Sequence, residues 1–141
     1  MVALSTVTLT TRRYVEEAGL ADRVDPLPAD VVQGPVPGLF DVAVMMRLIQ
    51  VLSADQARHV LRHVRQMLEP GGVLYIVGQV LDNSRLSPLE TVVGNIFFLN
   101  IFEEGQAYTE QEQRDWLAEA GCTGVERVVL PHKMSHIIAR K

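Results

Sequence analysis

Two short and almost uninterrupted apolar segments constrain the fold of this chain more than any other feature of its sequence. They cover residues 40–46 (FDVAVMM) and residues 73–81 (VLYIVGQVL). Apolar runs without alternation are typical of strands that are buried on both faces of a parallel sheet. Asp41 lies at the start of the first run, where we expect it to hydrogen-bond to a neighbouring loop. Both segments are therefore predicted to be buried strands of an α/β fold.

A helix with clear signals lies between these two strands. Ser53 and Gln56 have the spacing of a capping box, in which each side chain accepts a hydrogen bond from the other residue's backbone N–H. Apolar residues then recur at helical spacing, and they are Ala57, Val60, Leu61, Val64, Met67 and Leu68. Residues 69–72 (EPGG) end this predicted helix before the second strand.

The rest of the chain continues the alternation of strands and helices. We expect strands over residues 4–9, 23–27, 123–130 and 135–139, helices over 10–18, 87–100 and 109–121, and a proline-rich loop over 28–38. Thr109 and Glu112 form a second capping box at the start of the last helix. A short turn with Pro131 and His132 joins the last two strands, which makes that pair antiparallel. The 141 residues fit a single domain.

Composition and charge argue against several classes of function. The net charge of -4 lacks the basic excess that non-specific nucleic-acid binding requires, so no nucleic-acid partner is expected. No apolar run reaches the roughly 18 residues of a membrane span, so no membrane partner is expected either. The single cysteine, Cys122, excludes an internal disulfide. Arg12 and Arg13 follow the first apolar stretch instead of preceding it, unlike a secretory signal, and we expect a cytoplasmic protein.

Single polar residues are the candidates for a functional site, because the sequence contains no G-x-G-x-x-G, P-loop, H-E-x-x-H or G-x-S-x-G pattern. Ligands of open α/β sheets bind beyond the carboxyl ends of the strands. Asp30 follows the predicted strand over 23–27, and Arg47 and Gln50 follow the strand over 40–46. The alternatives are that Asp30 is a solvated loop acid or a helix cap, and that Arg47 pairs with a nearby acid.

The histidines and the cysteine favour structural roles. His59 and His63 share a helix face at a spacing that can bind a metal, but arginines surround them and no carboxylate shares that face. A solvated basic face is the better interpretation, and we expect no metal site. His132 and His136 flank a turn and are expected at the surface. Cys122 is expected to be a small core residue.

Taken as a whole, the sequence resembles the S-adenosylmethionine-dependent O-methyltransferases that act on small aromatic molecules, with plant phenolic and bacterial polyketide members. The resemblance covers nearly all 141 residues, in the order and spacing of that family. The segments that carry it are residues 14–24 (YVEEAGLADRV), 29–30 (AD), 40–42 (FDV), 48–50 (LIQ), 68–77 (LEPGGVLYIV), 108–121 and 135–140.

This resemblance implies a Rossmann-like class I methyltransferase sheet that ends in a reversed hairpin. The cofactor would be S-adenosylmethionine, with Asp30 facing its adenine amine and with Met46 and Arg47 beside it. Gln50 takes the position of the family's histidine base, and an amide cannot accept the proton. Methyl transfer would then rely on proximity of the two reactants. The helix around Asn95 and Asn100 would form part of the substrate wall for a small aromatic acceptor.

The sequence also departs from the family pattern. It has no glycine-rich loop after a first strand, and residues 5–8 (STVT) stand where the family has a ribose-binding acid. Gly78 and Ala107 replace two supporting acids of the plant members, and the N-terminal dimerisation domain is missing. We therefore expect residues 1–141 to be a partial methyltransferase domain without the first strand.

Three explanations stay open at this point. The chain is a fragment of a longer methyltransferase, it is completed by a partner chain, or it is a degenerate member that binds without methylating. The open sheet predicts a homodimer or a strand-exchanged oligomer. The corresponding functions are an O-methyltransferase, a non-catalytic interaction module, or a member that catalyses another reaction at the cofactor site. Cofactor binding by this chain alone is not expected.

Overall fold

The computed structural model describes residues 1–130 and 134–141. In chain order the elements are β1 (Val2–Ala3), α1 (Ser5–Glu17), β2 (Leu27–Pro28), β3 (Phe40–Met46), the 3-10 helix η1 (Ile49–Val51), α2 (Ala54–Met67), β4 (Leu68–Gly78), α3 (Leu89–Ile101), α4 (Glu110–Glu119), β5 (Thr123–Val129) and β6 (Ser135–Arg140). No helix among the described residues is long and apolar enough to cross a membrane.

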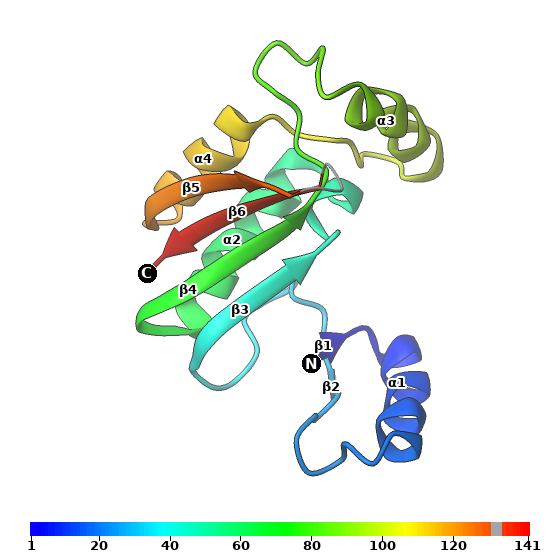
Figure 1. Cartoon of the computed structure of the whole chain (residues 1–141). Helices are drawn as coiled ribbons and strands as arrows, with labels where there is room; N and C mark the ends of the chain where they lie inside the picture. The colour runs from blue at the N-terminus through cyan, green and yellow to red at the C-terminus, as the bar shows by residue number, and fades with distance from the viewer. Residues whose placement is uncertain (131–133) are drawn as a thin grey trace.

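The strands form two separate sheets (Figure 1). The larger sheet has the order β3-β4-β6-β5, in which β3 and β4 are parallel and β6 runs antiparallel to both β4 and β5. The smaller sheet consists of β1 and β2, which are parallel. The α/β class and the antiparallel pair at the C-terminal end of the chain were both predicted from the sequence, and both are confirmed.

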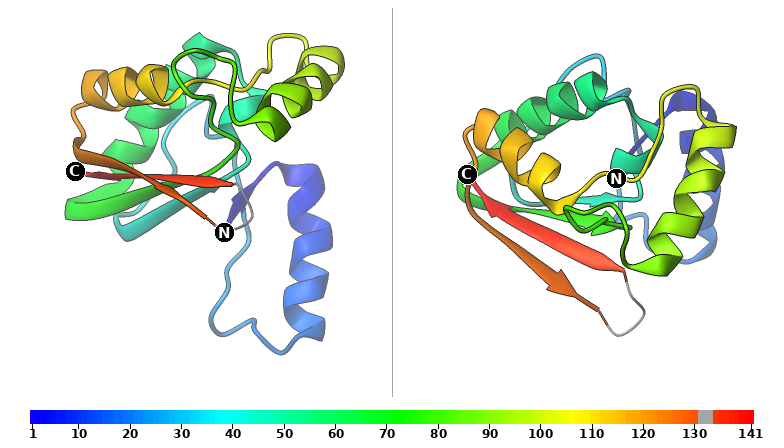
Figure 2. Two further views of the ribbon diagram at one scale, coloured as in Figure 1. Left: turned by 45° about the horizontal axis from the view of Figure 1, so that its top comes forward. Right: turned by 90° about the horizontal axis from the view of Figure 1, so that it is seen from above.

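The core lies between the larger sheet and helices α2 and α4, which cover one of its faces (Figure 2, left). Alternate strand residues point into this core, among them Met45 in β3, Leu74 and Ile76 in β4, and Ile137 in β6. The apolar side of α2 packs onto them from above with Ala57, Val60, Leu61 and Val64. Burying this many aliphatic side chains is the main stabilising contribution to the fold.

The opposite face of β3 is uncovered, which contradicts the prediction that residues 40–46 are buried on both faces. Val42, Val44 and Met46 point to that side, and Val44 and Met46 are 59% and 68% exposed. The prediction was wrong because the described helices cover only one face and because β3 is an edge strand. The Asp41 side chain is also exposed at the start of β3, and it makes no hydrogen bond among the described residues.

The N-terminal prediction was also wrong, since α1 covers most of the segment that was predicted as a strand. β-branched residues favour strands only weakly, and a helix can satisfy threonine hydroxyls within its own backbone. Thr8 and Thr11 both do so, through hydrogen bonds from Oγ1 to the carbonyl oxygen four residues earlier, at 2.9 and 3.0 Å. The strand expected over 23–27 is reduced to β2, which pairs with β1.

The central and C-terminal predictions agree well with the structure. Both capping boxes form, at Ser53 for α2 and at Thr109 for α4. The strand predicted from residue 73 begins earlier, since β4 starts directly after α2 and continues through the Pro-Gly-Gly segment with an irregular register. Gly72 permits this path, because a Cβ there would lie 2.9 Å from the Glu69 carbonyl oxygen.

Candidate functional site

A cavity of about 280 Å³ lies at the carboxyl ends of β3 and β4, where open α/β sheets bind their ligands. It is lined by residues that follow these two strands, by α3 and by the residue before β6, namely Arg47, Gln50, Gln79, Gly94, Phe97, Phe98 and Met134. Two of the predicted site residues, Arg47 and Gln50, are thus brought together in one cavity. Met134 comes from a segment more than 80 positions away in the sequence.

Gln50 forms a buried amide wall of this cavity. Its side chain is only 2% exposed, and its Nε2 donates a hydrogen bond to the backbone oxygen of Gln79 at 2.9 Å. The Oε1 atoms of Gln50 and Gln79 are both enclosed and have no hydrogen-bond partner among the described residues. Unpartnered buried acceptors are rare and cost free energy, and these two amides form an uncharged polar wall of the cavity. Gly78 lets the Gln50 amide lie directly on β4.

Arg47 is the charged residue of the cavity. Its backbone N–H continues the pairing of β3 with β4 by donating to the Val77 oxygen at 2.8 Å. The residue has a φ of 53°, which lies in the left-handed region that residues other than glycine rarely adopt. Its guanidinium lies 3.8 Å from the Met134 sulfur and takes part in none of the ion pairs found among the described residues. The alternative that Arg47 pairs with a nearby acid therefore finds no support in the described part of the chain.

Helix α3 supplies the aromatic wall. The rings of Phe97 and Phe98 meet edge to face, with centroids 5.9 Å apart. Gly94 lies against the side chain of Gln79, since a Cβ at Gly94 would be 2.8 Å from its Oε1. The sequence analysis did not select Gln79 or the two phenylalanines. Gln79 was missed because the predicted strand over 73–81 included it, whereas β4 ends at Gly78 and Gln79 follows it.

The two asparagines of α3 that were predicted as substrate contacts are both hydrogen-bonded to the backbone. Asn95 Oδ1 accepts a hydrogen bond from the Ala107 N–H at 2.6 Å, which ties α3 to the segment before α4. Asn100 Nδ2 donates to the Ile96 oxygen at 2.6 Å. Neither asparagine is among the residues that line the cavity. Their role as substrate contacts stays a prediction.

The other two residues that were predicted to contact the cofactor, Asp30 and Met46, lie outside this cavity. Asp30 is exposed in the loop after β2, and its Oδ1 accepts a hydrogen bond from the Val32 N–H at 3.0 Å. Met46 is exposed on the uncovered face of β3. Neither lines the cavity that contains Arg47 and Gln50. Their role as cofactor contacts also stays a prediction.

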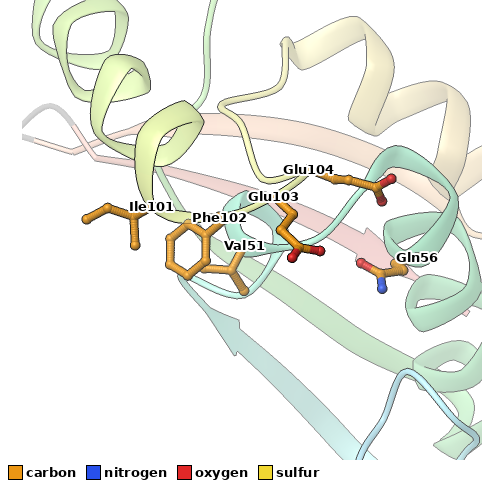
Figure 3. A pocket seen from close by; sticks show the side chains of 6 residues that line it. All are labelled: Val51, Gln56, Ile101, Phe102, Glu103 and Glu104. Carbon is orange, nitrogen blue, oxygen red and sulfur yellow. The ribbon is translucent and has the colours of Figure 1, made fainter.

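A second pocket of about 350 Å³ lies between η1, α2 and the end of α3 (Figure 3). Figure 3 shows apolar side chains on one side of it and Glu103, Glu104 and Gln56 on the other. None of the predicted site residues lines this pocket. Its two adjacent carboxylates have no further feature that would indicate a ligand.

The described histidines and the cysteine have ordinary structural surroundings. His63 Nδ1 lies 2.8 Å from the Val31 oxygen, and His59 is exposed. Among the described residues, no group of three or more histidine, cysteine, aspartate or glutamate side chains could hold a metal ion. Cys122 is buried as predicted, and this burial raises the pKa of its thiol. His132 lies outside the described residues.

The relationship of the chain to known proteins is decided by a family model for the O-methyltransferase domain, which matches residues 1–123. This chain belongs to that O-methyltransferase family. The family resemblance noted in the sequence is thereby confirmed.

Curated relatives agree with this assignment. A 3-hydroxy-5-methyl-1-naphthoate 3-O-methyltransferase of Streptomyces sahachiroi is 27% identical over 114 residues, which are 81% of this chain and 33% of the relative. The tetracenomycin polyketide synthesis 8-O-methyl transferase TcmO of Streptomyces glaucescens is 25% identical, over 92% of this chain and 38% of that protein. Mouse acetylserotonin O-methyltransferase is 31% identical, over 75% and 27%. The chain therefore spans roughly a third of the length of these relatives.

Solved structures show the same fold. The S-adenosylmethionine-dependent methyltransferase SibL in its apo form matches with a TM-score of 0.91 at 24% identity, over 100% of this chain and 42% of SibL. PigF with SAH matches with a TM-score of 0.90 at 19% identity, over 99% of this chain and 42% of PigF. These likenesses confirm the class I methyltransferase fold.

The residues of this chain do not form a complete site for S-adenosylmethionine. The smaller sheet, which leads to Asp30, is not hydrogen-bonded to β3, which leads to Arg47. Asp30 and Met46 line neither of the two pockets described above. In the described part of the chain, no glycine-rich loop lies between the two sheets to present backbone N–H groups to the charged end of such a molecule.

Proposed function

We propose that this chain is the acceptor-binding part of the catalytic domain of an S-adenosylmethionine-dependent O-methyltransferase, acting on a hydroxyl group of a small aromatic or polyketide compound. The observation that carries this proposal is the cavity at the carboxyl ends of β3 and β4, with its Gln50 amide and phenylalanine wall. The relatives named above act on hydroxyls of a naphthoate, of a polyketide and of acetylserotonin, as their names state. The cavity of this chain would hold an acceptor of that kind.

The chemistry assigned to this chain is positioning. When bound, S-adenosylmethionine supplies an electrophilic methyl group. Gln50 cannot remove a proton from the acceptor at neutral pH, because a carboxamide has no basic lone pair of suitable pKa. The cavity would instead hold the aromatic ring against Phe97 and Phe98 and fix the direction of its hydroxyl. Such orientation alone can provide much of the rate of a transfer between two bound molecules.

We further propose that the chain acts as a homodimer or a strand-exchanged oligomer. The free edge of β3 offers unpaired backbone groups, and Val42, Val44 and Met46 expose an apolar surface beside it. Strand edges of this kind favour pairing with another chain. A second copy would cover this apolar surface.

A non-catalytic module is the second candidate, and the incomplete cofactor site favours it. In that case the chain would use the methyltransferase sheet to bind a partner that carries the glycine-rich half of the fold. Such a complex would also explain the free edge of β3. For either function we propose a cytoplasmic location, since the single buried Cys122 suits a reducing compartment.

The test is a comparison of the chain alone with the chain combined with a polypeptide that contains the first strand and glycine-rich loop of a relative. Calorimetry measures binding of S-adenosylmethionine, and mass spectrometry measures methylation of a naphthol. We expect no binding by the chain alone, and both binding and methyl transfer by the complex. Binding without methyl transfer, for a range of phenols, would favour the non-catalytic module. Failure of the complex to bind S-adenosylmethionine would contradict the proposed methyltransferase activity.

A further inference from the structure

The outer side of α3 is apolar, and no other element of the described chain covers it (Figure 1). Leu89, Val93 and Ile96 lie on this side and are 58–69% exposed. The opposite side of the helix faces the protein, because Thr91 is buried there and Asn95 is hydrogen-bonded to the segment before α4. Soluble monomers rarely expose large apolar side chains in a contiguous group. The outer side of α3 is therefore a candidate interaction surface.

The spacing of these residues fits a second helix as the neighbour of α3. Leu89, Val93, Ile96 and Asn100 follow one another after four, three and four positions, which is the interval of the seam between two paired helices. We call these four residues the α3 seam. A single asparagine within an apolar seam specifies the register of a helix pair, since its amide requires a polar group opposite.

The loop before α3 extends this surface and holds it in place. Leu86 is 77% exposed in this loop. The Ser87 hydroxyl donates a hydrogen bond to Asp82 across the loop, and Arg85 pairs with Glu112 of α4 at 2.6 Å. Apolar groups that are already fixed in position lose little conformational entropy when a partner binds. The surface is thus prepared for contact without rearrangement of the loop.

The C-terminal end of this surface is acidic. Glu103 and Glu104 follow α3, are exposed, and line the same pocket as Ile101 (Figure 3). Neither glutamate takes part in the ion pairs found in the described part of the chain. They lie near the negative end of the α3 dipole, so both charges favour a cation there. The surface is therefore complementary in charge to a helix that has basic residues at this end.

We propose that the α3 seam binds a helix of another polypeptide, which has an apolar seam of its own and lysine or arginine residues beside Glu103 and Glu104. A second α3 is a poor partner, because this helix contains no lysine or arginine and has Glu90 in its first turn. Acidic groups would meet in either orientation of such a pair. The proposal does not depend on the proposed function, since the seam residues line neither of the two pockets.

The test measures binding of a fluorescent designed helical peptide to the 141-residue chain by fluorescence anisotropy. The peptide has about three heptads, with leucine at the seam positions and lysines at one end. A second peptide has glutamates in place of the lysines. The variant of the chain is Val93→Lys, and Val44→Lys is the matched control, because the two valines are 58% and 59% exposed on α3 and on β3. Lysine is a better helix former than valine, so α3 should stay folded, and circular dichroism checks this.

We expect the native chain to bind the lysine peptide at least about tenfold more tightly than the glutamate peptide. Val93→Lys should weaken binding of the lysine peptide about tenfold, and Val44→Lys should leave it unchanged. The double substitution Glu103→Gln and Glu104→Gln should remove most of the difference between the two peptides.

Several results would overturn this proposal. No binding of either peptide would exclude the surface as a helix site, and equal losses in the two lysine variants would show that the peptide binds apolar surface without preference for α3. Equal affinities of the two peptides would exclude the role of Glu103 and Glu104. Self-association of the native chain that Val93→Lys abolishes and Val44→Lys does not would identify a second copy as the occupant instead.

Discussion

The side-chain amide of Gln50 is tied to the end of β4, because its Nε2 donates a hydrogen bond to the backbone oxygen of Gln79 at 2.9 Å. This contact joins η1 to the strand and fixes one wall of the cavity. It depends on Gly78, the last residue of β4, since a Cβ there would lie only 2.3 Å from Gln50 Nε2. The position of the Gln50 amide therefore depends on the absence of a side chain at residue 78.

Gly78→Ala is expected to destabilise the protein by about 1–3 kcal/mol, because the added methyl group must displace a buried amide. In urea denaturation, the free energy of unfolding should fall by that amount. In NMR, the side-chain amide signals of Gln50 should shift. Gly34→Ala is the matched control, since nothing lies within 4 Å of a Cβ at that position. Equal stability of the two variants would contradict the close packing of Gln50 on β4.

The capping box of α2 gives a second prediction. Ser53 Oγ accepts a hydrogen bond from the Gln56 N–H at 3.2 Å, and Gln56 Oε1 accepts one from the Ser53 N–H at 3.0 Å. Ser53→Ala should lower the free energy of unfolding by about 1 kcal/mol, because it leaves a helix N–H without its partner. Ser5→Ala serves as the control, because Ser5 begins α1 without a side-chain cap. Its effect should stay within about 0.5 kcal/mol.

The parts of the fold that sequence reasoning predicted well have strong local determinants. Capping boxes, the Pro-Gly-Gly segment and helical periodicity each act over a few residues, and they placed α2, β4 and α4. Residues 4–9 have no such determinant. There the preference of Val7, Thr6 and Thr8 for strands contributes less free energy than the hydrogen bonds within α1.

The candidate site was predictable only in part, for a related reason. Arg47 and Gln50 follow a strand directly, so the rule for open α/β sheets finds them. Phe97 and Phe98 line the cavity because α3 lies near the carboxyl ends of β3 and β4, and nothing in their local sequence distinguishes them from the other apolar residues of that helix. The uncovered face of β3 was missed because composition cannot indicate which face a helix covers.

Asp82 provides a prediction of pH dependence. Hydrogen bonds from the hydroxyls of Ser87 and Ser84 stabilise its charged form and lower its pKa from 3.8 to about 2. A pKa below the value of the unfolded chain means that this group stabilises the fold above about pH 4 and loses that effect as the pH falls toward 2. In a carboxyl NMR titration, Asp82 should titrate near 2, and Ser87→Ala should raise its pKa. A titration midpoint near 4 in the unmodified protein would refute the hydrogen-bonded arrangement.

Cys122 should react slowly with thiol reagents in the folded protein. The side chain is buried, and burial raises the pKa of the thiol despite the nearby charge of Arg65. Both effects reduce the amount of accessible thiolate, which is the reactive form. With Ellman's reagent at pH 8, the folded chain should react at least about a hundredfold more slowly than the chain in urea, since labelling requires opening of the structure. Comparable rates in the two states would show that Cys122 is accessible.

The uncovered face of β3 leads to the last prediction, which concerns self-association. Val44 is 59% exposed on that face, next to the free edge of the strand. A lysine there would place a charge in any interface that covers the face, as natural edge strands do to prevent pairing. Val44→Lys should therefore convert a dimer to a monomer in sedimentation velocity at micromolar concentration, with little change in the stability of the monomer.

Val129→Lys is the matched control for this experiment. Val129 is 63% exposed at the end of β5, on the other edge of the larger sheet. If β3 is the interface, this substitution leaves the dimer intact. A native chain that sediments as a monomer would contradict self-association outright. Equal dissociation by the two lysines would contradict an interface at β3, because Val129 lies on the opposite edge strand of the larger sheet.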